Sequence, residues 1–80
     1  MKVYEYTAVV WKESEGYVSK CPELGVASYG QSFDGAVQNL REAVELYLEN
    51  AVELDLIGEV EESLTARKNL PHIWRRAFLD

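Results

Sequence analysis

The chain has 80 residues, of which 48% are apolar, and its formal net charge is −6 at pH 7. This apolar content excludes an intrinsically disordered chain, and the length allows one small domain. The longest apolar run, Ala8 to Trp11, is far shorter than the roughly 20 residues of a membrane helix, and no secretory signal is recognisable, so we expect no membrane partner.

The first predicted element is a strand over residues 3–11, followed by a polar turn that ends at Gly16, where glycine suits the turn geometry. Period-two alternation assigns the even positions of this strand to the core face: Tyr4, Tyr6, Ala8 and Val10. A short loop then joins it to an antiparallel strand over residues 17–21. A third strand over residues 26–31 completes a three-stranded antiparallel meander.

A long helix from Phe33 to about Leu54 follows, because apolar residues recur there at spacings of three and four. Ser32 can cap its first turn, and Asp34 suits the positive end of the helix dipole. The helix and the meander each have one apolar face, which predicts a two-layer α+β fold.

The C-terminal segment is less regular. Residues 59–67 can form a short helix, and Asn69-Leu70-Pro71 ends it. Residues 72–79 alternate as a fourth strand, while a last helical turn remains an alternative. The whole chain, residues 1–80, is expected to form a single domain.

Cys21 and His72 are each the only residue of their type. A single cysteine forms no intramolecular disulfide, which indicates a reducing, cytoplasmic setting, and we expect Cys21 to be buried as a small apolar residue. His72 has no neighbouring ligands in the sequence. We therefore expect no metal site and no cofactor.

Charge is distributed unevenly along the chain. Residues 1–62 carry 4 basic and 13 acidic side chains, whereas residues 63–80 carry 4 basic and 1 acidic. An acidic body repels nucleic acid and attracts a basic protein surface, although acidic residues also simply favour solubility. The basic tail contains Arg67, Lys68, Arg75 and Arg76 near Trp74; it can bind nucleic acid, but a match to an acidic helix is the better interpretation.

The polar side of the predicted helix carries Glu45, Glu49 and Glu53 at intervals of four residues, with Glu42 beside them. Like charges at this spacing repel by roughly 0.2–0.5 kcal/mol per pair. Such a local cost fits a surface that meets a cationic partner. An ordinary solvated helix face is the alternative.

Several short motifs occur together between residues 6 and 54. They are Gly16-Tyr17-Val18-Ser19, Cys21-Pro22-Glu23-Leu24, Gly25-Val26, Ser28-Tyr29-Gly30, and a helix opened by Ser32 that contains Ala36, Asn39-Leu40, Glu42-Ala43 and Glu45-Leu46-Tyr47-Leu48. In this order they resemble the HicB family of antitoxins in its compact, HicB-like form. The family usually has Pro-Gly after the leucine, whereas Leu24 is followed directly by Gly25.

The resemblance implies a β-β-β-α-β module likened to a partly degraded ribonuclease H fold. It also implies a partner, since the family typically neutralises HicA, a small basic toxin that cleaves messenger RNA. Many members carry a separate DNA-binding domain. Too few residues follow the helix for one here, so direct nucleic-acid binding is doubtful.

The ribonuclease H likeness raises the question of catalysis. Such chemistry needs several carboxylates that converge on magnesium ions. The first strand offers only Glu5, while Glu13 and Glu15 lie in the turn beyond its end and the helix carboxylates lie on a polar face. We therefore expect the protein not to be an enzyme.

The function expected from these observations is that of an antitoxin-like protein that occludes a basic, HicA-type toxin. The alternative is an orphan relative that serves as an oligomeric scaffold or a small-ligand module. The candidate partner-binding residues are Glu42, Glu45, Glu49, Glu53, Trp11 and Tyr29. Reversal of Glu45 and Glu49 to lysine is expected to leave the fold intact.

Self-association is also expected. A four-stranded sheet leaves open edges, and several large apolar residues are hard to bury in one unit of this size: Trp11, Leu56, Ile57 and Trp74. A symmetric homodimer or a higher even oligomer would form through an edge strand or through the end of the helix.

Overall fold

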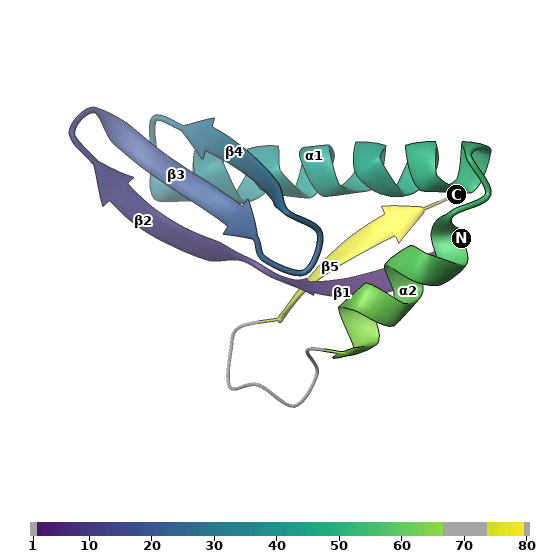
Figure 1. Ribbon diagram of the computed structural model, residues 1–80. Helices are drawn as coiled ribbons and strands as arrows, with labels where there is room; N and C mark the ends of the chain where they lie inside the picture. Colours follow the sequence, from purple (N-terminus) through teal and green to yellow (C-terminus); the bar gives the residue numbers. More distant parts are fainter. Residues whose placement is uncertain (1, 67–73, 80) are drawn as a thin grey trace.

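The computed structural model describes residues 2–66 and 74–79. Its strands are β1 (Lys2–Thr7), β2 (Val9–Glu13), β3 (Gly16–Cys21), β4 (Val26–Gly30) and β5 (Trp74–Leu79), and its helices are α1 (Phe33–Glu53) and α2 (Ile57–Ala66). The predicted α+β class, the meander, the long helix and the terminal strand are confirmed (Figure 1). His72 lies outside the described residues.

The predicted single strand over residues 3–11 is wrong in one respect, because it is two strands in two sheets. β2, β3 and β4 form an antiparallel three-stranded sheet, whereas β1 pairs antiparallel with β5 and places Lys2 opposite Leu79. The chain changes partner at Thr7, whose backbone N–H and hydroxyl donate to Glu23 Oε2 at 2.9 and 2.6 Å. A carboxylate thus takes the place of a neighbouring strand where the pairing ends.

The side-chain alternation of this segment follows the prediction apart from Thr7. Tyr6 is buried, while Val9 and Trp11 on the other set are exposed. Thr7 belongs to the set expected outside, yet it is buried. Its two hydrogen bonds to Glu23 explain this, since a buried hydroxyl and amide need acceptors.

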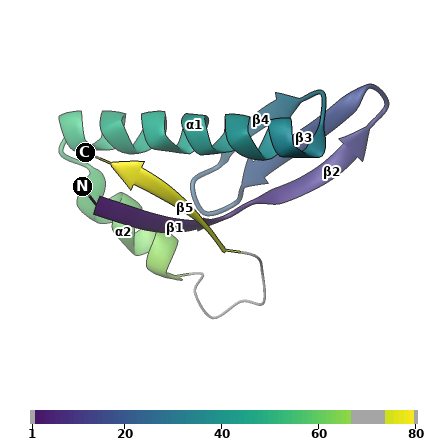
Figure 2. The same cartoon turned by 180° about the vertical axis from the view of Figure 1, so that it is seen from behind.

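Helix α1 lies against one face of the three-stranded sheet (Figure 2). As predicted, the Ser32 hydroxyl accepts a hydrogen bond from the Gly35 backbone N–H at 3.0 Å. The Ser19 hydroxyl donates to the Ala36 carbonyl at 2.8 Å, across the helix–sheet interface. A Cβ on Gly30 would clash with the backbone nitrogen of Ala36. Small residues at these two positions therefore let the helix approach the sheet closely.

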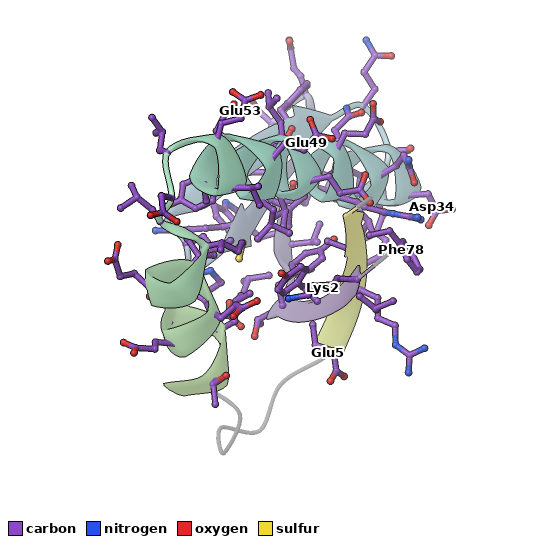
Figure 3. The ribbon with its side chains drawn as sticks, turned by 90° about the vertical axis from the view of Figure 1, so that its right-hand side faces the viewer. Lys2, Glu5, Asp34, Glu49, Glu53 and Phe78 are labelled. Carbon is purple, nitrogen blue, oxygen red and sulfur yellow. The ribbon has the colours of Figure 1, made fainter. Side chains whose placement is uncertain are left out.

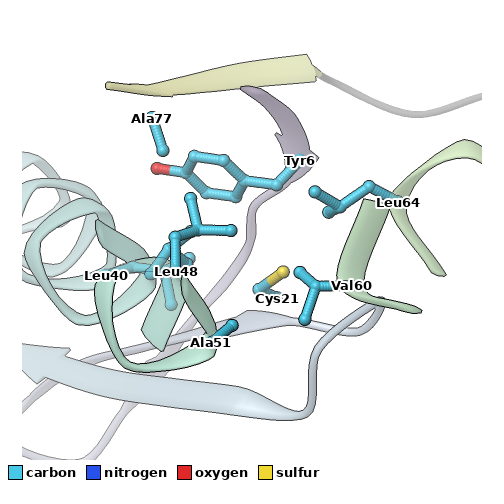
Figure 4. Packing of buried hydrophobic residues seen from close by; sticks show 9 residues of the cluster. Tyr6, Cys21, Leu40, Leu48, Ala51, Val60, Leu64 and Ala77 are labelled. Atoms are coloured by element: carbon cyan, nitrogen blue, oxygen red, sulfur yellow. The ribbon is translucent and has the colours of Figure 1, made fainter. Parts of the chain in front are cut away.

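The hydrophobic core joins all the layers (Figure 4). β1 contributes Tyr6, β5 contributes Ala77, and β3 contributes Cys21. The helices supply the remaining buried residues: Leu40, Val44, Leu48 and Ala51 from α1, and Val60 and Leu64 from α2. α2 is thus part of the core, and its bounds extend the short helix predicted over residues 59–67 to an earlier start.

Candidate protein-binding surfaces

The side of α1 that faces away from the sheets is strongly acidic. Glu42, Glu49 and Glu53 are exposed there, and Figure 3 shows Glu49 and Glu53 pointing away from the strands. Leu46, one turn after Glu42, lies among them and is 57% exposed. We call these four residues the acidic helix face.

Ion pairs do not neutralise the acidic helix face within the described part of the chain. The two ion pairs found there are Lys2–Glu61 and Arg41–Glu45. Glu42, Glu49 and Glu53 take part in neither of them. The local repulsion expected from the sequence is therefore not relieved by a described cation.

Glu45 does not belong to the acidic helix face. Its Oε2 atom accepts the backbone N–H of Phe78 in β5 at 2.9 Å and the Arg41 Nε–H at 3.4 Å. The Arg41 guanidinium also lies 4.9 Å from the centre of the Phe78 ring. Glu45 thus links β5 to α1, so we expect its reversal to lysine to destabilise the fold, in contrast to the expectation from the sequence alone.

Trp11 and Tyr29 lie on the opposite side of the three-stranded sheet from α1. The strand register places Trp11 directly opposite Val18, and Val18 directly opposite Tyr29. With period-two alternation, the face contains Val9, Trp11, Glu13, Val18, Lys20, Ala27 and Tyr29, which we call the outer sheet face. In the two ribbon views no described helix covers this face (Figures 1 and 2).

Both rings are held in place by polar contacts. The Trp11 Nε1–H donates to Glu13 Oε1 at 2.9 Å, and the Tyr29 hydroxyl donates to the Glu15 carbonyl at 2.9 Å. The Tyr29 side chain passes over Gly16, where a Cβ would clash with it. A glycine is thus needed at position 16 because the Tyr29 side chain comes so close to it. Backbone conformation does not require it, since the glycine with positive φ in the described residues is Gly25.

The six predicted residues consequently do not form one patch. Three of them lie on the acidic helix face, two lie on the outer sheet face, and Glu45 lies at the junction of α1 with β5. Sequence reasoning missed Leu46 and Val18. The signal for Leu46 was its apolar character between Glu42 and Glu49 on a polar helix face.

The structure also bears on reactive groups. Cys21 is a buried free cysteine, as predicted, and its Sγ–H donates to Glu23 Oε1 at 3.5 Å. Burial is the main cause that raises the pKa of this thiol to about 12. The thiol is therefore neutral near pH 7, which makes it a poor nucleophile. Within residues 2–66 and 74–79, no three His, Cys, Asp or Glu side chains cluster in a way that could hold a metal ion.

A groove of about 360 Å³ lies between the end of α1, α2 and the turn after β3. Its apolar lining comes from Leu24, Tyr47, Ala51, Leu54, Leu56 and Val60. The volume is near the lower limit for small-molecule sites.

Neither described helix is long and apolar enough to cross a membrane.

Comparisons with known proteins place the chain in a family. No family model matches it. It is 43% identical over 53 residues to the UPF0150 protein ssr1765 of Synechocystis, a match that covers 64% of this chain and 67% of that protein. It is 45% identical over 42 residues to a UPF0150 protein of Helicobacter pylori, which covers 51% of this chain and 58% of that protein.

The fold is similar to that of a solved antitoxin. The crystal structure of HicB from Burkholderia pseudomallei matches 100% of this chain with a TM-score of 0.57 and 24% identity. This chain spans 64% of that antitoxin. The resemblance to HicB seen in the sequence motifs is thereby confirmed in the fold. Since two thirds of the Synechocystis protein aligns at 43% identity, the chain belongs to the UPF0150 family.

Proposed function

We propose that this protein binds a small basic toxin of the HicA type and occludes its RNA-binding surface, without chemistry of its own. The observation that carries the proposal is the acidic helix face, with three exposed carboxylates around one exposed leucine. The likeness of the fold to the HicB antitoxin supports it.

Charge and apolar contact would contribute differently to such a complex. The three carboxylates attract a cationic surface over a long range, which mainly raises the rate of association and makes it sensitive to salt. Lasting affinity comes from apolar residues near the centre of an interface. Leu46 occupies that position on the acidic helix face, whereas Trp11 and Tyr29 lie on another side of the molecule.

The proposal is tested by reversing charge on this face without touching Glu45. Glu42→Lys with Glu49→Lys is compared with Glu15→Lys and Glu62→Lys, two exposed carboxylates elsewhere that give the same change in net charge. Association with a basic HicA-type toxin is followed by stopped flow at low and high salt. We expect the first pair to slow association at least about tenfold at low salt, and the second pair much less.

Equal slowing by the two pairs would mean that net charge alone matters, and the acidic helix face would then be an ordinary solvated surface. A second readout is protection of RNA from the toxin, which should fail with Leu46→Lys at toxin ratios where the parent protects.

The groove beside α2 supports the alternative function, because its apolar lining could hold a small ligand in an orphan relative. The two functions are separated by the neighbouring reading frame. A gene for a small basic protein there favours the toxin partner, and its absence in the genome context favours the ligand or scaffold function.

A further inference from the structure

The outer sheet face is unusual for a surface that no described helix covers. An antiparallel sheet with one face on the core normally carries polar side chains on the other. Here Val9, Trp11 and Tyr29 are 42%, 41% and 48% exposed, and Val18 stands between the two rings. Exposed apolar groups gathered on one face mark a contact surface.

The charges on this face are balanced. Its two charged side chains are Glu13 and Lys20, and the register places them at opposite ends, since Glu13 faces Gly16 while Lys20 faces Val9. The face is therefore neutral on a chain of net charge −6. A basic partner gains little there compared with the acidic helix face. A second copy, which the acidic helix face repels, meets little repulsion there.

We propose that the outer sheet face is the surface through which two copies of this chain associate, face to face, as a symmetric dimer. A two-fold axis that crosses the strands at right angles stacks β2 on β2 and β3 on β3, with the strands running in opposite directions. The Trp11, Val18 and Tyr29 row then packs on its own copy. Glu13 comes close to Lys20 of the partner subunit, and the reverse pair forms by symmetry.

Both aromatic rings of the proposed contact are already oriented within one chain, before a second copy binds. Trp11 is oriented by its exposed hydrogen bond to Glu13, and Tyr29 is oriented by its exposed hydrogen bond to the Glu15 carbonyl. Rings that are already oriented in this way lose less conformational entropy on association than freely rotating ones. This location differs from the edge strand or helix end expected from the sequence.

The size of the face limits the strength of the dimer. Three strands of about five residues give a footprint of roughly 14 by 17 Å. This is smaller than the interface of a stable complex, which buries about 800 Å² per partner. We therefore expect a dissociation constant of roughly tens to hundreds of micromolar, weaker than that of a standard-sized interface.

The first test is sedimentation equilibrium of the full chain from about 10 µM to 1 mM, a range that covers weak dimers. We expect the average mass to rise from 9.1 kDa toward twice that value. Trp11→Lys should weaken the dimer at least about tenfold, because it places two like charges at the centre of the contact. Leu46→Lys, which also replaces an exposed apolar residue by lysine, is the matched control and should leave the dimer unchanged. Circular dichroism checks that both variants are folded.

The second test uses the two charges and does not disturb the rings. Lys20→Glu should weaken the dimer several-fold, because Glu13 then faces a carboxylate of the partner subunit. Adding Glu13→Gln should restore most of the loss, since the amide oxygen can still accept the Trp11 N–H. Added salt screens both the Glu13–Lys20 attraction and the net repulsion between the copies, so the parent dimer should change little with salt, whereas toxin binding should weaken.

A monomer over the whole concentration range would overturn the proposal. So would a dimer that Trp11→Lys leaves intact, or a Lys20→Glu loss that Glu13→Gln does not recover. These measurements contain no toxin, so their failure would leave the proposed toxin binding standing.

Discussion

The two faces of the three-stranded sheet are built in opposite ways. On the side of α1 the side chains that meet the helix backbone are small, since the Ser19 hydroxyl and Gly30 lie against it at Ala36. The larger Tyr17 on this side packs edge-on against the Phe33 ring at the start of α1. On the outer side they are large, and Trp11 and Tyr29 stand exposed. The comparison teaches that small residues mark the points where the helix backbone comes close to the sheet. Large apolar residues that stay exposed mark the face that is still free for a partner.

Glycine-to-alanine substitutions give the largest expected effect and sharpen this comparison. On the helix side, Gly30→Ala brings a Cβ against the backbone of Gly35 and Ala36, which cannot move without shifting α1. We expect a loss of about 3 kcal/mol or more in the free energy of unfolding. On the outer side, Gly16→Ala meets the Tyr29 hydroxyl and ring, which can swing away, and the Gly30 carbonyl oxygen at 2.8 Å. Of these close contacts only the last is with backbone, so Gly16→Ala should cost less.

Urea denaturation measures both variants. A larger loss for Gly16→Ala than for Gly30→Ala would contradict the view that the helix side is the tightly packed one.

The second prediction compares two carboxylates one turn apart on α1. Glu45→Ala removes the acceptor of the Phe78 N–H and the partner of Arg41, which leaves a partly buried donor without this acceptor. The expected loss in the free energy of unfolding is about 1–3 kcal/mol. Glu49→Ala, on the exposed side, should change it by less than about 0.5 kcal/mol. A similar loss in the free energy of unfolding for both variants would mean that Glu45 is an ordinary solvated residue that does not link β5 to α1.

Sequence patterns predicted the parts of this fold that depend on local spacing. The α1 periodicity and its Ser32 cap are visible within a few residues, and the alternation of residues 3–11 correctly put Trp11 outside. The break after Thr7 and the role of Glu45 depend on partners 16 and 33 residues away, Glu23 and Phe78. No local pattern contains such partners. Whether Trp11 and Glu49 share a surface depends likewise on which sheet face α1 covers.

The third prediction uses the buried thiol on the core side. Burial raises the pKa of Cys21 from its ordinary value of 9.0 to about 12, so between these values the unfolded chain loses this proton while the folded chain keeps it. The unfolded state is then favoured as the pH rises, and stability falls above pH 9. Below pH 9 the group has no effect, because the thiol is protonated in both states.

Cys21→Ala should therefore make the decline between pH 9 and 11 shallower, by at most about 1.4 kcal/mol per pH unit, even though the variant is less stable at pH 7. Partial burial, and then the hydrogen bond to Glu61, raise the pKa of Tyr4 as well, so Tyr4 adds to the decline above pH 10 in both proteins. An unchanged slope in the cysteine variant would rule out the thiol as a source of the alkaline instability.

The smallest effect is expected on the outer face. Trp11→Phe removes the Nε1–H that donates to Glu13 and replaces the indole by a smaller ring at a position that is 41% exposed. Exposed hydrogen bonds exchange readily with water, so we expect the free energy of unfolding to change by less than about 0.5 kcal/mol. Urea denaturation at low micromolar concentration keeps the proposed dimer dissociated and isolates the single chain. A loss above about 2 kcal/mol would show that the Trp11 ring supports the core, and the outer face would no longer be free for a second copy.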